Sequence, residues 1–147
     1  MNKTYTAQQS VQIRAPAAKV WQALIRPELV KQYLFGTEIT ADWRVGGAIT
    51  YRGQWEGKPY LDKGVVKVFE PERLLVTTYF SSLSGSEDKP ENYSTVTYRL
   101  AESEGRTTLT IIQDNNPTQE AADHSAANWA VVLEALKILV EKSAATK

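Results

Sequence analysis

Residues 125–142 read SAANWAVVLEALKILVEK, and this stretch decides the fold. Its apolar residues recur at intervals of three and four, the spacing that places side chains on one face of an α-helix. That face comprises Trp129, Val132, Leu133, Leu136, Leu139 and Val140. The opposite face is charged, with Glu134, Lys137, Glu141 and Lys142. We therefore predict a long C-terminal helix that packs one wide apolar face against the rest of the protein. Asn116 is its expected N-cap and Pro117 its first residue, with Gln119 placed to complete a capping box.

Residues 37–114 supply the surface that this helix covers. In the preceding helical segment apolar residues recur about every 3.6 residues, whereas in residues 37–114 they recur about every two. The shorter period is typical of half-buried strands. The candidate strands are residues 37–42, 48–56, 63–70, 74–80, 94–102 and 107–114. Short turns at residues 46–47, 57–59, 70–72 and 103–105 separate most of them, and residues 81–92 form one long polar loop. Connections this short predict antiparallel pairing, because a parallel crossover needs a dozen or more residues.

The N-terminal part adds one strand and two short helices. Residues 9–13 alternate as a strand does, and Pro16 then suits the first turn of a helix. Pro27 ends that helix and starts a second one over residues 28–34. The whole chain, residues 1–147, is therefore predicted to be one α+β domain of the helix-grip type. In it, a curved antiparallel sheet of seven strands wraps around the C-terminal helix.

The composition excludes several classes of protein. Seventeen basic residues balance seventeen acidic ones, so no net field draws the chain to nucleic acid or to an anionic membrane. The absence of cysteine excludes disulfides and thiolate metal ligands. No signal-like segment opens the sequence, and no apolar run approaches the roughly 20 residues that span a bilayer. We expect a cytoplasmic protein.

The alternation also predicts which side chains face the interior, if exposed charges are taken to point outward. The expected lining of a cavity between sheet and helix is Tyr51, Trp55, Val66, Val76, Thr78, Phe80, Tyr98, Ile111, Gln113, Trp129, Val132 and Leu136, with Phe35 and Trp43 at its mouth. This set is apolar apart from a few hydrogen-bonding tips, and it contains no side chain that titrates near neutrality. Such a chamber is typical of a small-molecule site. A solidly packed core is the alternative that the pattern leaves open.

The sequence predicts no catalytic or metal-binding set. His124 is the only histidine, and it falls in the polar first turns of the C-terminal helix beside Asp123 and Ser125. A solvated helical histidine explains it better than a catalytic triad or a metal ligand does. Asp42 and Asp114 lie at turns or strand ends, where aspartate commonly caps the backbone. We expect neither a metal nor a cofactor.

Several motifs, taken in order, resemble one known family. They are APAAKVWQAL (residues 15–24), DWRVGG (42–47), GVV (64–66), PERL (71–74), STVT (94–97), TTLT (107–110) and NW (128–129). With this order and spacing the chain is similar to the START/Bet v 1-like (SRPBCC) superfamily, in the branch named after the activator of Hsp90 ATPase. Similar proteins often carry a histidine where this chain has Gln113, and a glycine where it has Asn128. The first difference removes a titrating group from the cavity.

The resemblance implies a hydrophobic pocket between sheet and helix but does not choose a function, because the superfamily holds carriers, receptors, cyclases and a co-chaperone domain. The leading hypothesis is binding of a small hydrophobic molecule such as a lipid, a sterol or an aromatic compound. A polyketide cyclase or dehydratase acting by substrate folding is the first alternative. The second is a module that binds an Hsp90-type chaperone, suggested by the family name alone. A homodimer through an edge strand near residues 37–42 is also left open.

Overall fold

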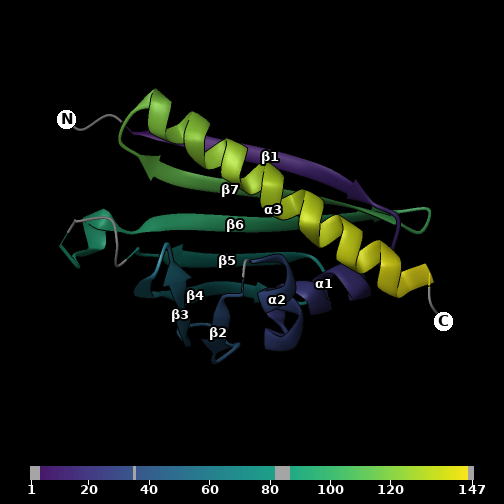
Figure 1. Cartoon of the computed structure of the whole chain (residues 1–147). Helices are drawn as coiled ribbons and strands as arrows, with labels where there is room; N and C mark the ends of the chain where they lie inside the picture. Colours follow the sequence, from purple (N-terminus) through teal and green to yellow (C-terminus); the bar gives the residue numbers. More distant parts are fainter. Residues whose placement is uncertain (1–3, 35, 82–86, 146–147) are drawn as a thin grey trace.

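The computed structural model describes residues 4–34, 36–81 and 87–145, which form a curved sheet with a long helix lying across it (Figure 1). The strands are β1 (Tyr5–Ile13), β2 (Glu38–Ala41), β3 (Ala48–Trp55), β4 (Lys58–Glu70), β5 (Leu74–Tyr79), β6 (Ser94–Ser103) and β7 (Arg106–Asn116). The helices are α1 (Ala17–Ile25), α2 (Pro27–Tyr33) and α3 (Gln119–Ala145), with a 3-10 turn at Pro90–Asn92. The predicted α+β helix-grip fold is confirmed.

The sheet has the order β1-β7-β6-β5-β4-β3-β2, with antiparallel pairing throughout. Strands β2 to β7 form a meander, as the short predicted turns require. Strand β1 pairs with β7, so β1 and β2 are the two opposite edges of one sheet. The segment that joins them, α1 and α2, must therefore cross the width of the sheet. Figure 1 shows these two helices beside the C-terminal half of α3.

Local chemistry fixes the ends of α1 and α2. Pro16 precedes α1 with extended backbone, and the Glu102 carboxylate accepts a 2.7 Å hydrogen bond from the free amide of Ala17. A carboxylate at this end is favourable because unpaired amides and the helix dipole make it positive. Pro27 opens α2, where a missing N–H leaves no helical bond unmade. The predicted break between the two helices is thus confirmed.

Helix α3 begins two residues later than Asn116-Pro117 predicts. The N-cap is Thr118, whose hydroxyl accepts a 2.9 Å hydrogen bond from the Ala121 amide. Asn116 instead ends β7, and its side-chain amide donates to the carbonyl of Tyr5 at 3.0 Å. The prediction failed because an asparagine side chain can cap a helix or bond to the backbone of another segment. Here Asn116 bonds to the edge strand β1 and does not cap α3. From this start α3 packs along β1 and reaches α1 and α2.

The β3–β4 connection is tighter than the sequence analysis predicts. Glu56 and Gly57 both adopt positive φ, 51° and 80°, and Trp55 pairs directly with Lys58. Two consecutive residues with positive φ make the two-residue hairpin turn whose twist suits antiparallel strands. Strand β4 therefore begins at Lys58, five residues before its predicted start at Lys63, and runs to Glu70.

The core lies between the concave face of the sheet and the three helices. Its largest fully buried side chains include Ile13, Ile49, Leu109, Ile111, Leu133 and Leu136. Leu133 and Leu136 come from the predicted apolar face of α3, and the other four come from strands. Exposed Val131 and Ile138 lie on the outer side of that helix. The wide apolar stripe of residues 125–142 therefore faces the sheet as predicted.

Candidate functional site

A small pocket lies between the α1–α2 segment and the inner face of the sheet. It is lined by Leu24, Val30, Tyr33, Leu34, Ile39, Trp43, Tyr51, Leu75, Thr77 and Tyr98. Leu24 comes from α1, Val30 and Tyr33 come from α2, and Leu34 directly follows α2. No lining residue comes from α3. The space open to the centre of a water molecule is about 20 Å³, which suffices for roughly one water. The lining is apolar except for the hydroxyls of tyrosine and threonine and the indole of Trp43.

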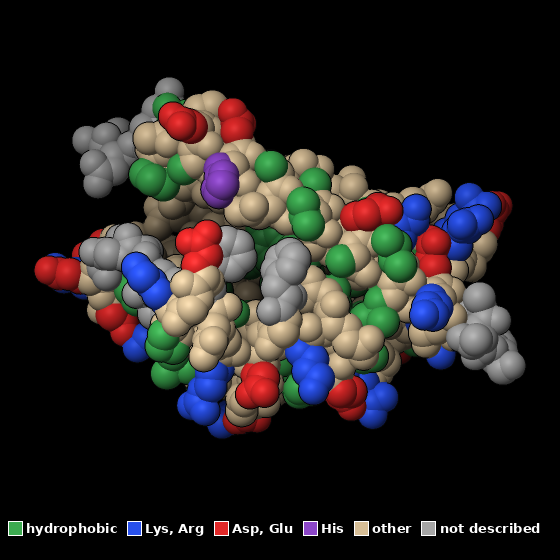
Figure 2. Space-filling view, in the orientation of Figure 1, with side chains coloured by type: hydrophobic (Ala, Val, Ile, Leu, Met, Phe, Trp, Pro, Cys, Tyr) green, Lys and Arg blue, Asp and Glu red, His purple; other side chains and the backbone are tan. Residues whose placement is uncertain are grey.

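This position differs from the predicted one between the sheet and α3. Val132 and Leu136 are buried in the general core and do not line the pocket. Trp129 lies next to it, because its ring meets the lining residue Tyr98 edge to face at 6.2 Å. Figure 2 shows the surface hollowed between α3 and the elements below it, with hydrophobic side chains visible inside. The cover of this pocket comes from α1 and α2, and the predicted cavity between sheet and α3 stays a prediction beside it.

The predicted facing of β5 is wrong by one residue. Leu75 and Thr77 line the pocket, whereas the predicted Val76 and Thr78 do not. The pairing of β4 with β5 shifts between Val66 and Val68, as at a β-bulge. This bulge reverses the facing within β4 beyond Val66 but leaves the alternation of β5 intact. Strand β5 contains no charged residue, so the rule that charges point outward could not fix its facing. Thr78 instead accepts a 2.9 Å hydrogen bond from the Val65 amide.

The remaining predicted site residues fall into three groups. Tyr51, Tyr98 and Trp43 line the pocket, the last as part of its wall and not only of its mouth. Val66, Phe80 and Ile111 are buried but do not line it, and Phe80 stacks on Tyr93 with ring centres 5.2 Å apart. Phe35 and the side chain of Trp55 lie outside the described residues.

Gln113 has a structural task that the sequence analysis did not assign. Its side-chain oxygen accepts a 2.7 Å hydrogen bond from the indole Nε1 of Trp129. This bond ties β7 to α3 and fixes the ring that rests on Tyr98. Glutamine at this position therefore anchors the helix against the sheet beside the pocket.

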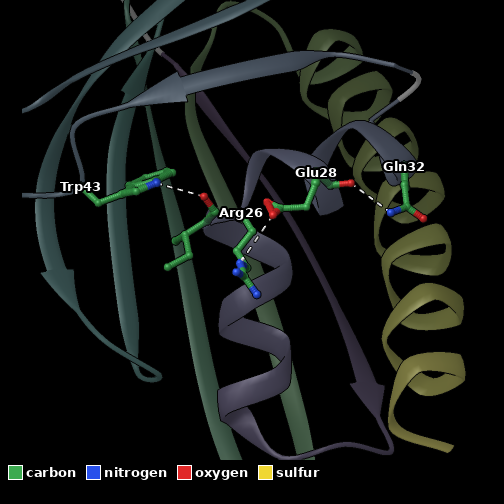
Figure 3. A network of polar contacts seen from close by, with 5 residues as sticks. Arg26, Glu28, Gln32 and Trp43 are labelled. Atoms are coloured by element: carbon green, nitrogen blue, oxygen red, sulfur yellow. Dashed lines mark hydrogen bonds and ion pairs between the residues drawn. The ribbon is translucent and has the colours of Figure 1, made fainter. Parts of the chain in front are cut away.

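Trp43 is held in the pocket wall by the end of α1. Its indole Nε1 donates a 3.0 Å hydrogen bond to the Ile25 carbonyl, as Figure 3 shows. The ring also stacks on Phe69 at 6.2 Å. On the exposed side, Arg26 and Glu28 form an ion pair of 3.8 Å next to this contact. The loop before β3 is thus fastened to the junction of the two helices that cover the pocket.

The polar side of the pocket contains an unsatisfied hydroxyl. Among the described residues, Thr77 Oγ1 is the buried side-chain atom without a hydrogen-bond partner, and Thr77 is only 1% exposed. The phenols of Tyr51 and Tyr98 line the same pocket. Burial raises the pKa of both phenols; at Tyr51 the Asp62 carboxylate adds to this rise, and the Thr77 hydroxyl, which is near the phenol but not placed for a hydrogen bond with it, opposes the rise. All three hydroxyls therefore stay protonated, and each can donate or accept a hydrogen bond.

A buried acid adjoins these hydroxyls, and sequence reasoning missed it. Asp62 is 6% exposed, accepts a hydrogen bond from the Tyr79 hydroxyl and pairs across the strands with Tyr51. The rings of Tyr51 and Tyr79 meet edge to face at 5.5 Å. Burial, and then the bond to Asp62, raise the pKa of Tyr79. The signal was available, since Val66 was assigned to the inner face and the same alternation leads back through residue 64 to Asp62.

The described residues offer no metal site and no membrane span. No group of three or more His, Asp or Glu side chains among them could hold a metal ion. His124 is exposed near the start of α3. In the same part of the chain, no helix combines the length and the apolar character needed to cross a membrane.

Comparison with known proteins agrees with this architecture. ChR145 from Cytophaga hutchinsonii is 40% identical, with 97% of each chain covered and a TM-score of 0.83. The Aha1 dimer from Colwellia psychrerythraea is 21% identical over 93% of this chain and 96% of that one, with a TM-score of 0.72. DynU16, from the dynemicin biosynthetic locus, is 20% identical over 95% of this chain and 48% of that one, with a TM-score of 0.76. The last two likenesses show the fold alone.

A search among curated protein sequences found no match. The family model of the activator of Hsp90 ATPase homolog 1-like proteins matches residues 14–141, from the end of β1 to the last turns of α3. This range includes every residue that lines the pocket. The chain therefore belongs to the activator of Hsp90 ATPase homolog 1-like family.

Proposed function

We propose that this protein binds a small hydrophobic or aromatic molecule in the pocket between the α1–α2 segment and the sheet, without a dedicated catalytic set. The observation that carries the proposal is the unsatisfied Thr77 hydroxyl inside an apolar lining. A buried hydroxyl without a partner is costly, and packed cores avoid it. A pocket that combines apolar walls with a few convergent polar groups is the usual form of a small-molecule site.

The pocket must widen to admit such a molecule, because drug-sized ligands occupy several hundred Å³ and the open space is about 20 Å³. The wall best placed to move is α2, a helix of seven residues that contributes Val30 and Tyr33. Isolated helices of this length are marginal in water, so α2 depends on its packing for stability. We expect ligand entry to displace α2 while the sheet stays in place.

Thermal unfolding tests this proposal with a matched pair of variants. Thr77→Ile and Val76→Ile each add one heavy atom to the side chain, the first inside the pocket, where it also removes the hydroxyl, and the second on the other face of β5. A screen of fatty acids, sterols and aromatic compounds against the wild type identifies a stabilising ligand. Saturation a hundredfold above Kd is worth about 2.7 kcal/mol, or several degrees in Tm.

The ligand-induced rise in Tm should be lost in Thr77→Ile and kept in Val76→Ile. Native mass spectrometry of the complexes gives an independent reading of occupancy. Equal rises in both variants would place the ligand elsewhere. No stabilisation by any compound class would mean that the interior is a solid core.

An enzyme of the cyclase or dehydratase type is a second candidate, and the buried Asp62 favours it. This carboxylate, held by Tyr79 beside Tyr51, is an acid–base group next to the pocket. DynU16 belongs to a biosynthetic locus, which is compatible with this reading. Incubation with poly-β-ketone substrates should then give a cyclised or dehydrated product, and Asp62→Asn should stop turnover while leaving binding intact. Turnover that survives the substitution would remove Asp62 from the mechanism.

We also propose a homodimer through the edge strand β2, as the Aha1 protein from Colwellia psychrerythraea is a dimer. Strand β2 pairs with β3 on one side and forms the end of the sheet on the other. Sedimentation velocity should show a dimer that Thr40→Pro dissociates, because proline removes a backbone donor. A monomer at all concentrations would contradict this.

A further inference from the structure

The polar side of the pocket restricts the ligand that it takes. Resting on the proposed binding function, we infer that the pocket selects an uncharged molecule whose apolar body carries a single polar oxygen, as in a ketone or an alcohol. It discriminates against the corresponding carboxylate. Three features of the described residues carry this inference: an unsatisfied hydroxyl, neutral phenols beside it, and a pocket lining that contains no basic side chain.

The unsatisfied hydroxyl requires a polar atom in the ligand. Thr77 Oγ1 is buried without a partner, while Leu75 and other apolar side chains surround it in the lining. A ligand made only of hydrocarbon would leave it unsatisfied. A ligand oxygen placed against it would form a hydrogen bond in a dry site, where such a bond discriminates strongly.

The charges near the pocket exclude an anion. None of the ten lining residues is Lys, Arg or His, so a carboxylate would be buried without a cation. The Asp62 carboxylate lies close enough to raise the pKa of Tyr51, and it would repel a second negative charge at the same place. Burial of an unpaired charge costs several kcal/mol. The phenols of Tyr51 and Tyr98 donate hydrogen bonds but do not supply positive charge.

Three naphthalene probes of nearly equal shape separate these effects. 2-Acetylnaphthalene carries a ketone, 2-ethylnaphthalene carries no polar atom, and 2-naphthoate carries a carboxylate. Titration calorimetry at pH 8 should give the ketone about tenfold higher affinity than the ethyl compound, the usual effect of one hydrogen bond. The carboxylate should bind at least about a hundredfold more weakly than the ketone.

The variant Thr77→Val removes the hydroxyl at nearly constant volume, and Thr97→Val does the same on the neighbouring strand, opposite Val76. Thr77→Val should abolish the preference for the ketone over the ethyl compound and keep the affinity for the ethyl compound, which also shows that the variant is folded. Thr97→Val should keep both affinities. An unchanged ketone preference in Thr77→Val would overturn the inference.

The outcomes also separate this inference from the proposed function. If the wild type binds all three probes equally, the pocket binds hydrophobic molecules but does not select an uncharged oxygen. If the carboxylate binds best, the inference is wrong although the binding function stands. If none of the probes binds, the proposed function fails and the inference fails with it.

Discussion

Replacing Thr77 by valine should stabilise the free protein, although the substitution removes a polar group from a strand. Thr77 is 1% exposed and its hydroxyl has no partner among the described residues. Folding therefore removes this hydroxyl from water without replacing its hydrogen bonds, which costs about 1–3 kcal/mol. Valine has nearly the same shape and avoids this cost. We expect a gain of about 1–2 kcal/mol in the free energy of unfolding, or roughly 2–8 °C in Tm for a chain of this size.

Thr107 provides the matched control. It is also buried, at 0% exposure, but its hydroxyl donates a 2.8 Å hydrogen bond to the Ala15 carbonyl. Thr107→Val leaves that buried carbonyl without its donor, so it should lower the free energy of unfolding by about 1–3 kcal/mol. Two buried threonines on the same sheet are thus expected to respond with opposite sign to the same substitution.

Urea unfolding followed by tryptophan fluorescence measures both variants. The midpoint should rise for Thr77→Val and fall for Thr107→Val, with the slope m unchanged in each case. A lower midpoint for Thr77→Val would show that its hydroxyl has a strong partner in the folded state. The argument for an unsatisfied atom in the pocket would then be refuted.

Three further predictions concern the surroundings of the pocket. Burial raises the pKa of tyrosines such as Tyr51 and Tyr79, so the folded state keeps protons that the unfolded chain releases above about pH 10. Stability should therefore be fully present below about pH 10 and fall as the pH rises further, with the phenolate absorbance of these buried tyrosines appearing only as the protein unfolds. Trp129→Phe removes the donor to Gln113 and should cost about 1–3 kcal/mol in urea unfolding; an unchanged midpoint would mean that this bond contributes nothing. Glu102→Ala removes the carboxylate at the start of α1 and should cost about 1 kcal/mol, measured as a lower Tm, whereas Glu102→Gln should cost less.

The order of the elements could be predicted from the sequence because it depends on local signals. Pro16 and Pro27 mark the starts of α1 and α2 within one residue, and the three-four spacing of residues 125–142 is the apolar face of α3. These signals act within one or two turns of helix, so the sequence contains them in full. The errors at the starts of β4 and α3 arose where one residue type suits two conformations, as Asn116 does.

The candidate site could be predicted only in part, because it depends on which side chains of each strand point to the inner face of the sheet and on long-range packing. Tyr51, Tyr98 and Trp43, which the sequence places around a cavity, line the small pocket of the structure. Strand β5 contains no charged residue to fix its facing, so the prediction took Thr78 where Thr77 lines the pocket. Each face of β5 carries apolar side chains and one threonine, so neither face is marked as the inner one. Asp62, in contrast, could have been found by following the alternation of β4 two residues further.

The position of the pocket follows from the connectivity of the sheet. Because β1 and β2 are opposite edges, α1 and α2 must cross the inner face, while α3 packs along β1. The middle strands β5 and β6 then receive their cover from two short helices, and Thr77 faces this cover. Burial favours an apolar residue there, and we expect the threonine to lower the stability of the free protein because its buried hydroxyl has no partner among the described residues. Places where a protein departs from such rules are where binding or catalysis is expected. A ligand oxygen that satisfies Thr77 would recover this lost stability, so the same atom that weakens the free protein would favour the complex.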